Sequence, residues 1–185
     1  MELALTWDLV IIIFFAVVTA YSFIVGEDES VTIIIAGYIA LLAVEAAGHL
    51  VTLGLASSSS LLETIGLTPD PGTLATAKVL AFAAAIILLA IRGGFSVSYD
   101  EQPGSIITTI LTGAFGVSTS CFLLTSLLTF IAGTPLLDDS LATAPAVAPL
   151  MTGSRLVEGM ILYQHVWFAL PALLLLVAGF FHRHR

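Results

Sequence analysis

Residues 7–25 read WDLVIIIFFAVVTAYSFIV and form the first long apolar run of the chain. A run of this length with so few charges predicts a membrane-spanning helix, because a helix satisfies its own backbone hydrogen bonds inside lipid. A cleaved signal peptide is the alternative, with residues 18–20 as a loose cleavage site. The run continues to Val25, however, and no Lys or Arg precedes it, so we expect the first helix to be retained.

Further apolar runs follow along the chain, separated by short polar segments. Together with the first run they predict spans over about 7–25, 31–55, 73–91, 105–132 and 159–181. Residues 26–30 are expected to form a tight acidic turn, and residues 61–67 a short helix on the membrane interface. Three prolines exclude one continuous helix over residues 133–158, whereas Pro171 can be tolerated as a kink. The predicted fold is all-α, a bundle of about five spanning helices in one domain, residues 1–185.

The composition supports a chain embedded in lipid. Hydrophobic residues make up 58% of the sequence and the mean hydropathy is +1.10. Only 10% of residues are charged, against roughly 25% in soluble domains. The formal net charge of −8 argues against nucleic acid as a partner, because that binding needs a basic face. The lone Cys121 excludes an intrachain disulfide and a cysteine metal cage.

Orientation depends on five basic residues. Arg92 ends the third predicted span, and residues 182–185, HRHR, end the fifth, so both fall on the same side of the membrane. Basic loops favour the cytoplasm. We therefore expect the cytoplasmic (inner) membrane, with the N-terminus outside and the C-terminus in the cytoplasm. Arg155 falls on the outer side and does not fit this tendency.

Glu45 and His49 are candidate functional residues inside the second predicted span. They lie four positions apart and share one helix face. Ionisable residues inside a membrane are expensive, and they often mark a functional site. Lys78, near the start of the third span, is the expected partner of Glu45 if these helices are antiparallel. The functional interpretation is a proton-linked or ion-conducting site; the alternative is a structural ion pair.

The fourth predicted span is rich in small and hydroxyl-bearing residues. Their spacing follows the small-xxx-small pattern, which lets helix backbones approach closely where lipid offers no hydrophobic drive for association. The candidate packing face comprises Thr109, Thr112, Gly113, Gly116 and Ser120. Packing within the chain is the simplest interpretation, and a homo-oligomer interface or a polar pore lining are the alternatives.

Signatures of catalysis and cofactor binding are absent from the sequence. It contains no G-x-S-x-G elbow, H-E-x-x-H zinc motif, Walker-type phosphate loop or dinucleotide fingerprint. We therefore expect no enzyme activity, cofactor or metal site. The proline-rich segment 133–158 carries Asp138, Asp139, Arg155 and Glu158, and it is interpreted either as an ordinary surface loop or as a contact for a partner protein.

The order of these features resembles the colicin V production protein family of small bacterial inner-membrane proteins. The resemblance comprises residues 6–11, TWDLVI, the turn at Gly26, the third span closing on Arg92, and Gly113 and Gly116 in the fourth span. It implies a non-enzymatic protein linked to toxin production or export, or to envelope homeostasis, that packs with itself or with partners. A small channel or transporter subunit, with a polar path through Glu45, His49 and Lys78, is the alternative function.

Overall fold

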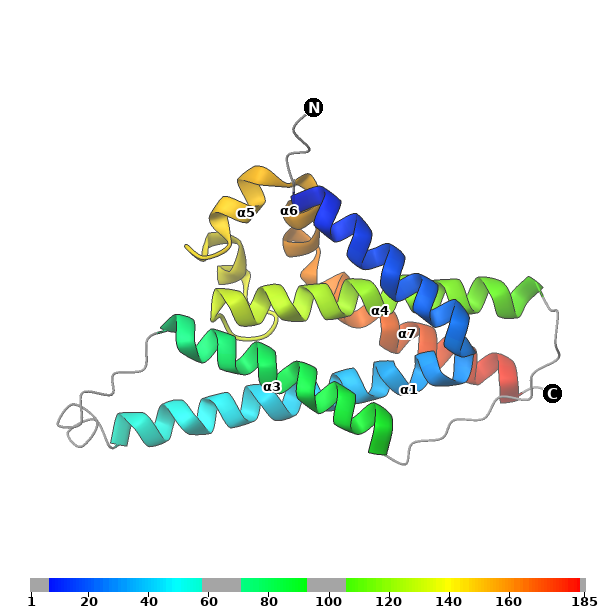
Figure 1. Ribbon diagram of the computed structural model, residues 1–185, viewed down its shortest axis with the longest axis horizontal. Helices are drawn as coiled ribbons and strands as arrows, with labels where there is room; N and C mark the ends of the chain where they lie inside the picture. Colours follow the sequence, from blue (N-terminus) through cyan, green and yellow to red (C-terminus); the bar gives the residue numbers. More distant parts are fainter. Residues whose placement is uncertain (1–6, 58–70, 93–105, 184–185) are drawn as a thin grey trace.

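The computed structural model describes residues 7–57, 71–92 and 106–183, and every structural statement below concerns these residues. They form helices and contain no strand, so the all-α prediction is confirmed (Figure 1). The elements are α1 (Trp7–Ser57), α3 (Pro71–Arg92), α4 (Ile106–Ala132), the 3-10 helix η1 (Asp139–Thr143), α5 (Ala148–Gly153), α6 (Arg155–Leu162) and α7 (Gln164–Arg183). The interfacial helix expected at residues 61–67 and the side chains of residues 182–185 lie outside the described part.

A bend at Gly26 divides α1 into an N-terminal arm, residues 7–25, and a C-terminal arm, residues 27–57. Gly26 has φ 88° and ψ −177°, a conformation that is open to glycine and strained for other residues. The chain reverses across the bundle at this point (Figure 1). The predicted turn over residues 26–30 is therefore too long. Residues 27–30 are already helical, because acidic side chains are favoured in the first turn of a helix.

Helix α4 is the interior helix of the bundle. It contacts both arms of α1 and also α3, α6 and α7. In its most apolar stretch 67% of residues are buried, against 11% in the most apolar stretch of α1 and 6% in that of α3, although the C-terminal arm of α1 also buries Val31 and Ile34. Phe122 of α4 lies against Tyr38 of the C-terminal arm and Phe168 of α7, with ring centroids 4.5 Å and 5.9 Å away. The other helices therefore form an outer layer around α4.

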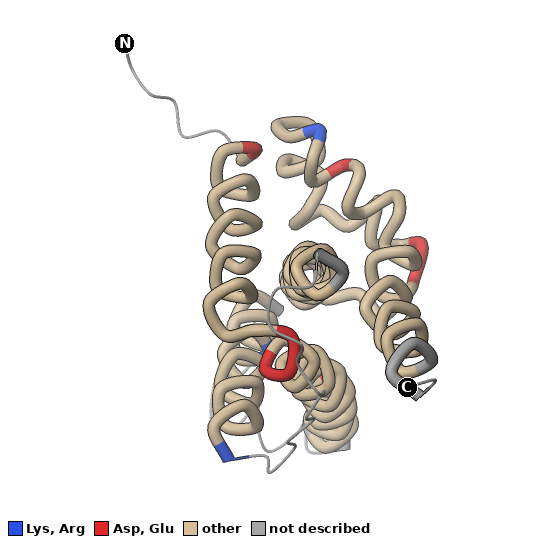
Figure 2. The backbone as a smooth tube through the Cα atoms, turned by 90° about the vertical axis from the view of Figure 1, so that its right-hand side faces the viewer, with Lys and Arg blue, Asp and Glu red and all other residues tan. Residues whose placement is uncertain are grey.

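Apart from Glu45 and Lys78, the charged residues of the described helices lie near helix ends, in the last part of the chain that follows α4, or at the bend of α1. Figure 2 shows long uncharged stretches, with charges gathered near helix ends and at the bend of α1. Three helical segments are long and apolar enough to cross a bilayer, Trp7–Gly54, Gly72–Arg92 and Thr108–Ala132. The pair α6 and α7, bent by 71°, adds a fourth if it counts as one broken span. The membrane-bundle class is supported, whereas the predicted count of five spans is not confirmed.

The predicted last span, residues 159–181, is not one helix. Helix α6 ends at Leu162 and α7 begins at Gln164, so the break falls at Tyr163 rather than at Pro171. The buried Gln164 side chain anchors the start of α7, because its Nε2 donates to the Asp138 carbonyl at 2.9 Å. Pro171 stays inside α7 and is buried.

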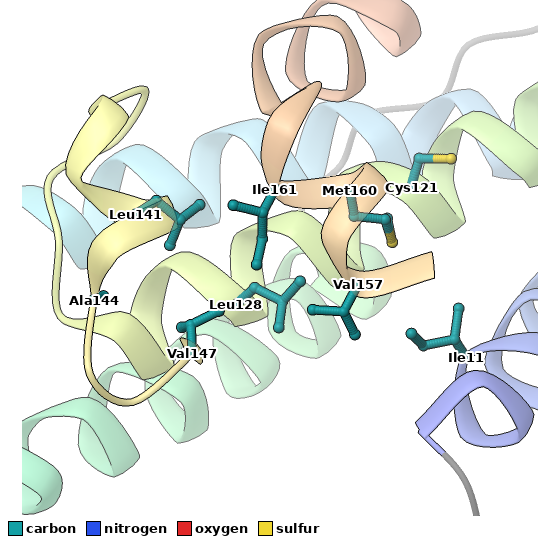
Figure 3. Packing of buried hydrophobic residues seen from close by; sticks show 9 residues of the cluster. All are labelled: Ile11, Cys121, Leu128, Leu141, Ala144, Val147, Val157, Met160 and Ile161. Carbon is teal, nitrogen blue, oxygen red and sulfur yellow. The ribbon is translucent and has the colours of Figure 1, made fainter. Parts of the chain in front are cut away.

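Residues 133–162, which we call the cap, fold onto one end of α4. The cap includes η1, α5 and α6, and it encloses a hydrophobic cluster with Leu128 and Cys121 of α4 and Ile11 of the N-terminal arm (Figure 3). The buried cap residues of this cluster are Leu141, Ala144, Val147, Val157, Met160 and Ile161. The segment is therefore a packed element with its own buried side chains, not a loose connection.

The close approach of α4 and the N-terminal arm provides a test of the packing. A Cβ at Gly116 would lie 3.0 Å from the Thr19 Cα, a backbone atom that cannot rotate away. Gly116→Ala should lower the free energy of unfolding in detergent by about 1–3 kcal/mol, because the two helices must separate. Gly179→Ala is the matched control, since its Cβ would meet no atom within 4 Å. Equal stabilities for the two variants would contradict this packing.

Candidate functional site

An ion pair joins the C-terminal arm of α1 to α3. Lys78 Nζ lies 3.1 Å from Glu45 Oε2, and the two side chains are 15% and 26% exposed. The antiparallel course of the two helices brings the two side chains together, as the sequence pattern predicted. Lys78 Nζ also lies 6.0 Å from the ring centroid of Phe130 on α4, at the outer limit for a cation–π interaction. The pair therefore lies where α1, α3 and α4 meet.

Gly48 provides the space that the lysine occupies. A Cβ at this position would lie 2.4 Å from Lys78 Cε and 3.2 Å from Nζ. Gly48 is three positions after Glu45, so both residues lie on the helix face that receives the lysine. Gly48 was not among the residues predicted for this site. Its signal was the glycine itself, since a glycine inside an apolar helix weakens the helix unless something packs closely against it.

His49 does not join the pair. Its side chain is exposed on the C-terminal arm, and its backbone carbonyl accepts a hydrogen bond from Thr52 Oγ1 at 2.8 Å. Among the described residues, the imidazole makes no hydrogen bond or ion pair with Glu45 or Lys78. Of the three candidate polar residues, the structure thus brings two together and leaves the third on the surface.

The small residues of α4 contact the N-terminal arm. Gly116 faces Thr19 and Ser22, and Gly113 faces the ring of Phe23. Thr112 and Ser120 are also buried, whereas Thr109 is exposed. The face from Thr112 to Ser120 is therefore occupied by another part of the same chain.

Six of the seven buried hydroxyl groups of α4 bond to their own helix, whereas Thr125 Oγ1 has no hydrogen-bond partner among the described residues. Ser120 Oγ donates to the Gly116 carbonyl at 2.8 Å, and Thr129 Oγ1 to the Thr125 carbonyl at 2.9 Å. Thr112, Ser118, Thr119 and Ser126 donate in the same way to carbonyls three or four residues earlier. Such bonds satisfy a buried hydroxyl without a partner helix. These groups therefore allow close packing, and they do not by themselves form a polar path.

A second polar site, which sequence analysis did not predict, joins the start of α1 to the cap. Asp8 Oδ1 accepts hydrogen bonds from Ser154 Oγ and from the Leu156 backbone N–H, the latter at 3.4 Å. Ser154 is the N-cap of α6, and its Oγ accepts from the Val157 N–H at 3.1 Å. The carboxylate is well placed, because the N-terminus of a helix carries partial positive charge.

Beside this contact lies an open cleft, which we call the cap cleft, of about 540 Å³. It is lined by Asp8, Met151, Thr152, Gly153, Ser154, Arg155 and Glu158. Three of these residues are ionisable, and they carry both signs of charge. The cleft is therefore polar, in contrast to the apolar surfaces of the spanning helices.

The remaining acidic residues of the cap have local roles. Hydrogen bonds from the backbone N–H and side chain of Ser140 hold the pKa of Asp138 below its usual value. Asp139 lies 3.5 Å from His165 Nε2, but both side chains are largely exposed, so the contact contributes little. Within the described ranges, no three His, Cys, Asp or Glu side chains gather in a way that could hold a metal ion.

No family model, curated protein or solved structure matches the chain. The resemblance to the colicin V production family therefore stays a prediction that rests on the residues quoted for it.

The ion pair can be tested with a double-mutant cycle. Lys78→Met should lower the free energy of unfolding in detergent by about 1–3 kcal/mol, because the Glu45 carboxylate loses its partner in a partly buried place. The double variant Glu45→Gln, Lys78→Met should lose less free energy of unfolding than the sum of the losses in the two single variants, because it contains no unpaired charge at this site. Additive losses in chemical or thermal unfolding would show that the two groups do not stabilise each other.

Proposed function

We propose that this chain is a non-enzymatic protein of the cytoplasmic (inner) membrane that works by docking a partner protein on its cap. We expect the protein to act in toxin production or export, or in envelope homeostasis, as the resemblance to the colicin V production family implies. The N-terminus and the cap lie outside in this proposal, and the C-terminus lies in the cytoplasm.

Five membrane crossings are part of the proposal. The 51 residues of α1 would extend about 76 Å as a straight helix, more than twice the roughly 30 Å of hydrocarbon in a bilayer. Because α1 bends at Gly26, each arm supplies one crossing. Helices α3 and α4 and the bent pair α6–α7 supply the other three. The cap then lies on the same side as Trp7.

The observation that carries the docking proposal is Leu137 on the cap. It is 49% exposed and has φ 59°, the left-handed conformation that costs a residue with a side chain about 1–2 kcal/mol. Its neighbours fix this conformation, because Leu136 packs into the core and the Asp138 carbonyl accepts from Gln164. Backbone strain of this kind concentrates at functional sites. Here it presents an apolar side chain at the surface of the cap, and a partner that covered this side chain would gain the free energy of burying it.

Leu137→Asn tests the docking surface. Asparagine tolerates the left-handed conformation, so the fold should be retained while the apolar side chain is lost. We expect the protein recovered with the tagged full-length chain from gently solubilised native membranes to fall at least about tenfold, as for an interface hot spot. Ala146 is another exposed residue of the cap, and Ala146→Asn should leave the amount of recovered protein unchanged. Unchanged recovery with Leu137→Asn, at equal expression and thermal stability, would refute docking at this surface.

A second candidate function is a small channel or transporter subunit. The Glu45–Lys78 pair favours it, because both groups are charged residues within predicted spans and retain partial exposure. Three observations weigh against it. The two charges already neutralise each other, His49 lies outside the pair, and six of the seven buried hydroxyl groups of α4 bond to their own helix.

Flux from liposomes separates the two candidates. Under the docking proposal, purified protein in liposomes should release no more protons or ions than protein-free liposomes do. A pH- or ion-dependent flux that Glu45→Gln abolishes would support the channel instead. A dye that reports internal pH and a potassium or sodium gradient provide the two measurements.

A further inference from the structure

The cap cleft combines one cationic and two anionic side chains from distant parts of the chain. Asp8 comes from the first turn of α1, and Arg155 and Glu158 from the first turn of α6. At about 540 Å³ the cleft lies within the range of small-ligand sites, roughly 300–1,000 Å³.

Most of this charge is not used by the fold. Asp8 Oδ1 holds the start of α6, whereas its second oxygen, Oδ2, has no hydrogen bond to the described residues. Arg155 and Glu158 are exposed and form no ion pair within the described part of the chain. The cleft thus offers a guanidinium to an anion and carboxylate oxygens to a cation.

Its surroundings are those of a membrane interface. Trp7 is half-exposed, and its ring lies against the cleft residue Gly153, 3.8 Å from where a Cβ would be. Tryptophan is enriched where lipid headgroups meet hydrocarbon. From the next turn onward the N-terminal arm exposes apolar side chains, including Ile12 and Ile13. A molecule with a charged head in the cleft could therefore place an acyl chain along this arm.

We propose that the cap cleft binds the headgroup of a zwitterionic phospholipid that carries a primary ammonium group, as phosphatidylethanolamine does. Arg155 binds the phosphate, since guanidinium matches phosphate geometry with paired N–H donors. Glu158 and Asp8 Oδ2 accept hydrogen bonds from the ammonium. Phosphatidylcholine offers no N–H donor, and phosphatidylglycerol offers no cation, so the cleft distinguishes these headgroups. The site goes beyond the docking function and uses none of the Leu137 surface.

Thermal unfolding of the full-length protein in detergent, with added lipid, tests the proposal. Phosphatidylethanolamine should raise the Tm in a dose-dependent way, because a ligand that binds only the folded state stabilises it. Phosphatidylcholine and phosphatidylglycerol with the same acyl chains should give smaller shifts. Arg155→Gln and Glu158→Gln should each weaken the apparent affinity for phosphatidylethanolamine by about tenfold or more, the effect of losing a charged hydrogen bond.

Matched controls make the result specific to the cleft. Arg92→Gln and Asp139→Asn make the same changes in charge outside it and should bind phosphatidylethanolamine as the unchanged protein does. If a cleft variant also has a lower Tm without lipid, phosphatidylethanolamine should still shift the Tm of that variant no more than phosphatidylcholine does. Free phosphoethanolamine should compete only at much higher concentration.

Three outcomes would overturn the proposal. They are equal shifts with phosphatidylethanolamine and phosphatidylcholine, cleft variants that keep the unchanged affinity, and free phosphoethanolamine that binds as tightly as the lipid. None of these outcomes bears on partner recovery with Leu137→Asn, so the two proposals fail separately.

Discussion

The close approach of α4 to the N-terminal arm of α1 is the constraint on which the bundle depends. Between helices in lipid there is no hydrophobic drive, because the surrounding chains are as apolar as leucine. Association must come from contact itself. Gly116 permits that contact with the backbone at Thr19, and most buried serine and threonine hydroxyls of α4 bond back to carbonyls of their own helix, so a fairly polar helix can occupy the interior.

Two other glycines, Gly26 and Gly48, also matter because they lack a Cβ, and each has a different effect on the structure. At Gly26 the missing Cβ permits the bend that turns one 51-residue helix into two arms. At Gly48 it leaves room for the Lys78 side chain to reach Glu45. Three glycines therefore shape the bundle. Gly26 permits the bend of α1, Gly116 permits the short distance between two helices, and Gly48 leaves room for a charged side chain between helices.

Local pattern predicted much of this structure, and contacts between distant segments account for what it missed. Apolar runs located α3 and α4 within two residues at each end, and the opposite charges of Glu45 and Lys78 indicated their pairing. At the break beside Tyr163, Gln164 donates a hydrogen bond to the Asp138 carbonyl, a contact between residues 26 positions apart that no local periodicity reveals. The same holds for the contact of Asp8 with the cap.

That contact between Asp8 and Ser154 also limits the order in which the protein can be assembled. The two residues are 146 positions apart, so the first helix is synthesised long before its cap partner leaves the ribosome. Until then the Asp8 carboxylate lacks the hydrogen bonds that the cap donates to it. Closure of the cap is thus a late event of biosynthesis, and a nascent chain truncated before Ser154 would lack the junction between its beginning and its end.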